Sequence, residues 1–211
     1  DNGCPWGPSV SEELAEAGDL ELLKWVKEEG GKLGFDCFSS AVKGGDIEML
    51  DWLKANGCSM INHNTEYLSA VAAARGSIAI LEWLIDEGCL LHYTAREEAI
   101  KAGHLDVLKW LIAHHCPGNI KMECSLAAKY EEPEIFKFLL AEHQKNFKWD
   151  EEVCASAALL GDLEVFKWLR NEGCPWDERA VNVAAKWGNM EVLKWAVQND
   201  CPWPRFDARS V

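Results

Sequence analysis

The sequence predicts an all-α protein, an α-solenoid of stacked helix-turn-helix repeats. The motif GDLELLKWVKEEG begins at Gly18, and related motifs begin at Gly45, Gly76, Gly103, Glu131, Gly161 and Gly188. Successive starts lie 27, 31, 27, 28, 30 and 27 residues apart. Repeats of this length bury their apolar faces only against neighbouring repeats. We therefore expect a single array with repeats at about 4–30, 31–57, 58–88, 89–115, 116–143, 144–173 and 174–200, and a partial repeat at 201–211.

Each repeat contains the signals for two short helices. In the last full repeat, Asp177 is expected to cap a first helix that runs to about Trp187, Gly188 to close it in the left-handed conformation, and Asn189 to cap the second helix. Other repeats carry the equivalent of Asn189 at Asp19, Asp46, Ser77, His104 and Asp162, of which all but His104 are strong capping types. Acidic residues followed by Lys three positions later, as in Glu164 and Lys167, are expected to form weak ion pairs along the second helices.

Packing between repeats must supply most of the stability, because isolated helices of this length are marginal in water. Tryptophan recurs at one position of the second helices, and we expect this row to be a stacking spine: Trp25, Trp52, Trp83, Trp110, Trp168 and Trp195, with Phe138 in the fifth repeat. A second row precedes the first helices and is expected to wedge against the preceding repeat: Trp6, Leu33, Leu91, Trp149 and Trp176. Paired alanines should let the first helices approach closely: Ala72 and Ala73, Ala127 and Ala128, Ala157 and Ala158, Ala184 and Ala185. The repeats should together form a curved rod.

The fifth repeat departs from the others. Glu131 replaces the turn glycine and Pro133 opens the second helix. Glu in a left-handed turn would be strained by about 1 kcal/mol, so we expect a turn of another shape. The polar stretch Gln144 to Lys148 follows. Because the stability of an array is roughly a sum over repeats and their interfaces, the junction of the fifth and sixth repeats is expected to be the weakest.

The composition argues against several kinds of partner. The net charge is -14, with 35 acidic and 21 basic residues, and such a surface repels nucleic-acid phosphates. No apolar run approaches the roughly 20 residues that span a bilayer, so we expect no membrane insertion.

The first residue is Asp1, and neither end resembles the polar cap of a solenoid. We therefore expect either a segment of a longer protein or a second chain that covers one end.

The cysteines point to packing rather than to disulfides or metal. Five of them recur at the turn that closes a repeat: Cys58, Cys89, Cys116, Cys174 and Cys201. Small buried thiols behave as compact hydrophobic groups, and the total of nine is odd with no CxxC pair. We expect no metal site, no cofactor, and reduced thiols in an intracellular, cytoplasmic protein.

The segment AAKWGNMEVLKWAVQND, residues 184–200, resembles the ankyrin repeat, and the resemblance covers the whole chain. It is closest to a divergent type with CPW and LKWL motifs, such as Cys174 to Trp176 and Leu108 to Leu111. The chain lacks the family's TPLH motif, and its repeats of about 27 residues are shorter than 33. This resemblance implies shortened or absent β-hairpins, and the extra length at Cys58 to Glu66 is the best candidate for a surviving one.

The resemblance also implies a binding module without catalysis that holds a protein partner on its concave face, made of loops and the exposed sides of the first helices. By position, the candidate partner-binding residues are Lys43, Arg75, Glu98, Lys101, Lys129, Tyr130, Leu159, Leu160, Lys186 and Trp187. Tyr130, Leu160 and Trp187 occupy equivalent positions and would either form an exposed apolar patch or pack against neighbouring helices.

Catalytic signatures are absent from the sequence, which has no GxSxG, no HExxH and no phosphate-binding glycine loop. We therefore expect no enzymatic activity and no small-molecule substrate. The alternative to a recognition module is a structural role, as a spacer or a permanently assembled subunit of a larger complex.

Overall fold

The computed structural model describes residues 7–58, 65–143 and 149–203, and within them it contains fourteen α-helices and no β-strand. The all-α prediction is confirmed. The chain divides into two compact units, Asp1–Pro117 and Gly118–Val211. The stretches Cys58 to Glu66 and Gln144 to Lys148, on which the hairpin and weak-junction predictions depend, fall largely or wholly outside the described residues.

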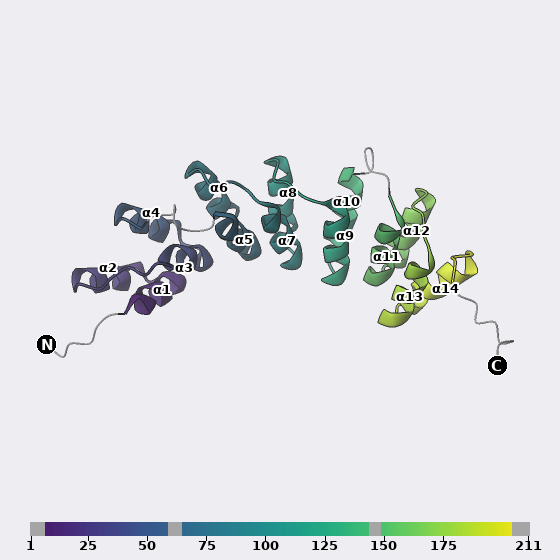
Figure 1. Ribbon diagram of the computed structural model, residues 1–211, viewed down its shortest axis with the longest axis horizontal. Coiled ribbons are helices and arrows are strands. Elements are labelled where there is room, and N and C mark those ends of the chain that lie inside the picture. Colours follow the sequence, from purple (N-terminus) through teal and green to yellow (C-terminus); the bar gives the residue numbers. More distant parts are fainter. Residues whose placement is uncertain (1–6, 59–64, 144–148, 204–211) are drawn as a thin grey trace. The chain divides into compact units, whose positions relative to one another are not determined.

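The first compact unit holds four pairs of helices: α1 (Pro8–Ala17) and α2 (Leu20–Glu28), α3 (Cys37–Gly44) and α4 (Ile47–Ala55), α5 (Thr65–Arg75) and α6 (Ile78–Asp86), α7 (Tyr93–Lys101) and α8 (Leu105–Ala113). Odd-numbered helices pack side by side in the order α1, α3, α5, α7, and each packs on the even-numbered helix that follows it (Figure 1).

The second compact unit repeats this arrangement with three pairs: α9 (Ile120–Lys129) and α10 (Pro133–His143), α11 (Glu151–Leu160) and α12 (Leu163–Asn171), α13 (Glu178–Trp187) and α14 (Met190–Gln198). Helix α11 packs between α9 and α13, and α12 packs on α14 (Figure 1). Each of the seven helix pairs falls within one of the segments expected to be a repeat, and the repeat boundaries themselves remain our prediction.

Most of the predicted helix ends are confirmed. Asp46 and Asp162 each accept two backbone amides of the helix they cap, while Asp19, Ser77 and Asp177 accept one. Gly188 ends α13 with a φ of 75°. The expectation of a different turn at Glu131 is wrong, because its φ is 59°. The amide of Glu132 donates to the Ala127 carbonyl at 2.8 Å, so hydrogen bonds typical of a left-handed helix end outweigh the strain.

Asn189 and His104 do not cap their helices, which corrects the prediction for Asn189. The Asn189 side-chain amide instead donates to the carbonyls of Ala158 and Leu159, at 2.8 and 2.9 Å, at the end of α11. His104 places Nε2 at 3.2 Å from the carbonyl oxygen of Ala74, at the end of α5. Both side chains therefore tie a repeat to the end of the first helix in the repeat before it.

The buried spine consists of aliphatic and phenylalanine side chains rather than tryptophan, which corrects the prediction for the Trp row. Fully buried side chains of the second helices come from neighbouring positions and include Leu23, Leu50, Leu53, Ile80, Leu81, Leu84, Leu108, Leu111, Phe136, Leu139, Phe166 and Leu169. Trp25 is 45% exposed, and the other tryptophans of the row are partly exposed. The Trp83 indole N–H donates to Asp51 at 2.8 Å, so this ring links adjacent repeats at the edge of the core.

The second aromatic row and the alanine pairs follow the prediction in part. Trp149 is buried, and the Trp176 ring lies 6.1 Å from that of Phe166 in the preceding repeat, whereas Trp6 lies outside the described residues. Three of the four alanine pairs are buried. Ala185 is exposed, contrary to expectation, because no further first helix packs on α13 within the described chain.

The recurring cysteines bind the preceding turn as well as filling space. The thiols of Cys116, Cys174 and Cys201 donate to the carbonyls of His92, Asp150 and Asp177, at 3.2, 3.4 and 3.4 Å. Burial raises the pKa of Cys201 to about 11, which keeps this thiol protonated as a donor near neutral pH. Cys116, Cys174 and Cys201 therefore donate a hydrogen bond to the preceding repeat in addition to the predicted packing role.

Asp162 is expected to stabilise the second compact unit in a pH-dependent way. Its carboxylate caps α12 and lies 3.2 Å from Nζ of Lys137 on α10. Burial alone would raise the pKa of Asp162, but the Val165 amide and Lys137 outweigh it and hold the pKa below its ordinary value. Since the unfolded pKa is about 3.9, the contribution is present above about pH 4 and lost as the pH falls through the folded-state pKa.

Replacing Asp162 with Ala should lower the free energy of unfolding by about 1 to 2 kcal/mol at pH 7, mainly through the lost cap. Asp162→Asn keeps an acceptor and should lose less. Urea denaturation followed by circular dichroism at pH 7 and pH 3 measures both. A deficit of the same size at both pH values for Asp162→Ala would contradict the assigned role of the charge.

Candidate interaction surface

The second compact unit carries a groove of about 360 Å³ on its first helices, which we call the Trp187 groove. It is lined by Ser125 of α9, by Glu152, Ala155, Ser156 and Leu159 of α11, and by Arg179, Asn182, Val183, Lys186 and Trp187 of α13. The α11 and α13 residues recur at helical spacings of three and four, so each set lies along one face of its helix. The sequence-predicted residues Leu159, Lys186 and Trp187 are therefore brought together.

Small side chains make room in the groove. Ser125, Ala155 and Ser156 are short, and the Ser156 hydroxyl donates to the Glu152 carbonyl at 3.0 Å instead of reaching outward. Trp187 is 60% exposed at the last position of α13. A large exposed indole beside a recess of small side chains is the arrangement found at protein-binding hot spots.

The charges of the groove come mainly from α13 and α11. Arg179 pairs with Asp177 through Nε at 2.8 Å and approaches Glu151 at 3.9 Å. Of the ionisable residues that line the groove, Arg179 and Lys186 are basic and Glu152 is acidic. Two cations and one carboxylate thus line the groove together with apolar and small polar side chains.

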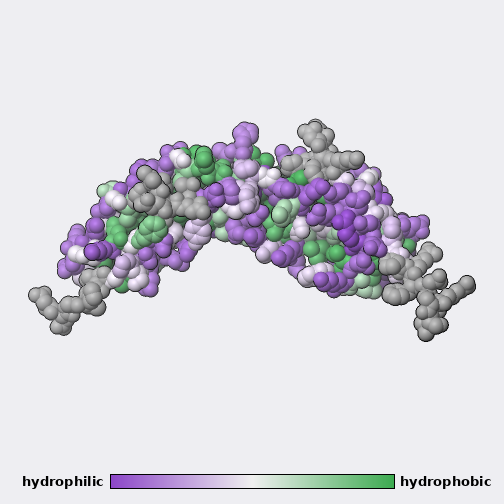
Figure 2. All heavy atoms as spheres, in the orientation of Figure 1, coloured by the Kyte–Doolittle hydropathy of each residue, from purple (hydrophilic) through white to green (hydrophobic). Residues whose placement is uncertain are grey.

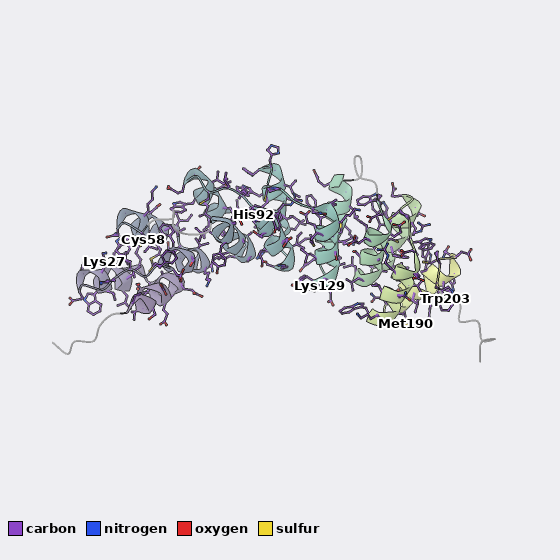
Figure 3. All side chains as sticks on the ribbon, in the orientation of Figure 1. Lys27, Cys58, His92, Lys129, Met190 and Trp203 are labelled. Carbon is purple, nitrogen blue, oxygen red and sulfur yellow. The ribbon has the colours of Figure 1, made fainter. Side chains whose placement is uncertain are left out.

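The other predicted site residues lie elsewhere. Lys129 and Tyr130, both exposed, end α9, where Nζ of Lys129 lies 5.6 Å from the Tyr130 ring centroid (Figure 3 labels Lys129). Leu160 is half-buried and does not line the groove, so the expected patch of Tyr130, Leu160 and Trp187 is not brought together there.

In the first compact unit, Glu98 pairs with Lys101 at 2.7 Å on α7. The Arg75 guanidinium donates to the Lys43 carbonyl and thereby joins the ends of α5 and α3. Arg75 is thus used within the fold, although its side chain is exposed.

Sequence reasoning missed Ser125, Glu152, Ala155, Ser156, Arg179, Asn182 and Val183. The sequence contained a signal for two of these residues. Asn182 and Val183 precede Lys186 and Trp187 by one helical turn, so they lie on the same face of the helix. Hydrophilic residues cover much of the face drawn in Figure 2, and hydrophobic residues form separate patches on it. Exposure alone therefore does not single out these positions.

Among the described residues, no three His, Cys, Asp or Glu side chains come together as metal ligands. None of the described helices combines the length and the apolar character needed to cross a bilayer.

Stacked helix pairs and a grooved face of first helices define the chain as a helical repeat protein. A family model described as ankyrin repeats, in three copies, matches residues 38–123. The crystal structure of the human ASB11 ankyrin repeat domain has a TM-score of 0.67 to this fold, with 21% sequence identity, and the match covers 88% of this chain and 96% of that chain. No curated protein matches. Residues 38–123 thus match ankyrin repeats, which generally serve in protein interactions, and the chain as a whole is similar in fold to an ankyrin repeat domain.

Proposed function

We propose that this chain is a non-catalytic protein-interaction module and that its partner binds in the Trp187 groove. The observation that carries the proposal is the juxtaposition of Trp187, 60% exposed, with Leu159 and the small side chains of α11. An apolar side chain of the partner can enter beside the indole, where burial of apolar area and exclusion of water favour binding.

The remaining candidate residues extend this proposal. Lys129 and Tyr130 at the end of α9 are proposed as flanking contacts, because α9 also contributes Ser125 to the groove. Lys43, Arg75, Glu98 and Lys101, on the first helices of the first compact unit, are proposed as further partner contacts.

The charge and the thiols bear on the partner and the compartment. A net charge of -14 disfavours nucleic acid as the partner. The eight described cysteines are free, which is consistent with the proposed intracellular, cytoplasmic location.

Trp187→Ala combined with Leu159→Ala should reduce partner capture about tenfold or more, since aromatic hot-spot residues each contribute about 2 kcal/mol or more. The measurement places a photo-crosslinking amino acid at Asn182, exposes the protein to extract from its source cells, and identifies the adduct by mass spectrometry. Trp203→Ala is a matched control, because Trp203 is 49% exposed and does not line the groove.

The proposal predicts one dominant adduct from Asn182 that is lost in the double variant and kept in Trp203→Ala. Equal capture by the folded double variant would contradict it. A partner that copurifies in fixed stoichiometry and cannot be removed without unfolding the chain would favour the structural-subunit alternative.

A further inference from the structure

The first compact unit contains a second groove, of about 450 Å³, between α5 and α7, which we call the Tyr67 groove. Helix α5 lines it with Glu66, Tyr67, Ala70, Val71 and Ala74, and α7 lines it with Thr94 and Glu98. Because Ala70 and Ala74 lie one turn apart on α5, their small side chains form a continuous floor. The loop residue His92, labelled in Figure 3, directly precedes α7.

The chemistry of this groove differs from that of the Trp187 groove. Its two ionisable carboxylates, Glu66 on α5 and Glu98 on α7, stand on opposite walls, and none of the described residues that line it is Lys, Arg or His. Tyr67 is 48% exposed and offers a ring face as well as a phenolic group. Carboxylates together with an exposed aromatic ring attract a cation by charge and by the quadrupole of the ring.

Two basic groups next to the groove already hold these carboxylates. Nε2 of His92 lies 3.7 Å from Glu66, and Nζ of Lys101 lies 2.7 Å from Glu98. The side chains of Glu66 and Glu98 remain 52% and 37% exposed in these pairs. Exposed pairs contribute little, so a ligand cation that contacts both walls can compete with His92 and Lys101.

We propose that the Tyr67 groove binds a Lys or Arg side chain from a basic segment of a partner polypeptide. The aliphatic part of that side chain lies on Ala70 and Ala74, and its charged end lies between Glu66 and Glu98, near Tyr67. Charge complementarity selects this occupant, because the described residues that line the groove include two carboxylates and no cation. The site is separate from the Trp187 groove, so either proposal can fail alone.

The test uses the full 211-residue chain and a fluorescein-labelled nonapeptide in which Arg and Gly alternate, with binding measured by fluorescence anisotropy. A second peptide carries citrulline in place of Arg, which keeps the shape and removes the charge. The Arg peptide is expected to bind at least tenfold more tightly than the citrulline peptide, because paired charges provide most of the attraction.

Charge-matched variants test whether binding depends on carboxylates inside the Tyr67 groove or on net charge alone. Glu66→Gln with Glu98→Gln should weaken binding of the Arg peptide about tenfold. Glu82→Gln with Asp106→Asn changes the net charge equally at exposed positions of α6 and α8, and should leave binding within about twofold of the parent. Ala70→Leu fills the floor without a change of charge and should also weaken binding.

Equal weakening by the two charge-matched pairs would overturn the proposal, since it would mean that only net charge attracts the peptide. Tight binding of the citrulline peptide, or no effect of Ala70→Leu in a folded protein, would also overturn it. Trp203→Ala serves as an internal reference, because Trp203 is exposed and lines neither groove, and should leave peptide binding unchanged.

Discussion

Phe166→Ala should lower the free energy of unfolding by about 3 to 5 kcal/mol, the usual cost of removing a buried Phe side chain. Phe166 on α12 is fully buried, and its ring contacts that of Trp195 edge to face at a centroid distance of 5.8 Å. The substitution therefore leaves a cavity between two repeats and removes an aromatic contact. Local repacking can recover only part of this loss.

Trp168→Ala is the comparison for Phe166→Ala, because it tests the predicted tryptophan row on the same helix. Trp168 belongs to the predicted tryptophan row and has the larger side chain, but it is only half-buried and borders a surface recess with Leu140 and Val165. Its loss should cost about 1 to 2 kcal/mol, because part of its surface already contacts water. Urea denaturation followed by far-ultraviolet circular dichroism measures both variants without relying on indole fluorescence.

Hydrogen exchange should accompany these measurements, because repeat arrays can unfold in stages and a single transition is then not well defined. Phe166→Leu is the conservative control and should cost less than Phe166→Ala. A loss from Trp168→Ala as large as that from Phe166→Ala would restore the tryptophan row as the energetic spine.

Gly161→Ala should destabilise the second compact unit by about 2 to 4 kcal/mol, through backbone strain together with lost hydrogen bonds. Gly161 has a φ of 78°, in the left-handed region. A Cβ at this position would lie 2.7 Å from Cγ and Oδ1 of Asn189. The Asn189 side chain would have to move and would release the carbonyls of Ala158 and Leu159.

Gly188→Ala separates the two effects. Gly188 has a similar φ of 75°, but a Cβ there would meet nothing within 4 Å. This variant should therefore show only the strain, about 1 to 2 kcal/mol. Thermal unfolding and urea titrations of both variants give the difference, and Asn189→Ala should abolish most of it. Equal losses in Gly161→Ala and Gly188→Ala would mean that the Asn189 contact contributes nothing measurable.

The candidate site could be predicted only in part. Trp187 stands out from the sequence because it ends a first helix at a position where other repeats have small residues such as Ala17, Gly44 and Ala102. Arg179 and Glu152 do not, because charged residues on helices are common and most are simply solvated. Arg179 and Glu152 line the same groove only because α11 packs against α13. Local sequence patterns do not specify which helices pack together.

Leu160 illustrates the same limit. Its position in the repeat matches that of Trp187, yet Leu160 is half-buried whereas Trp187 is exposed. Helix α11 packs between α9 and α13, while α13 has a first helix on one side only within the described chain. Equivalent positions therefore differ in exposure because their neighbours differ.

The sequence alone determined the class of fold, the helix pairs and most of their caps, because these depend on local signals that recur with the repeat period. A left-handed glycine or an Asp that accepts the amides of the next turn acts within a few residues. Only the tertiary structure decided which apolar residues form the spine, because the depth of Phe166 relative to Trp168 depends on the neighbouring helices. It likewise decided that Asn189 ties two repeats together rather than capping α14, because the carbonyls it binds belong to the preceding repeat.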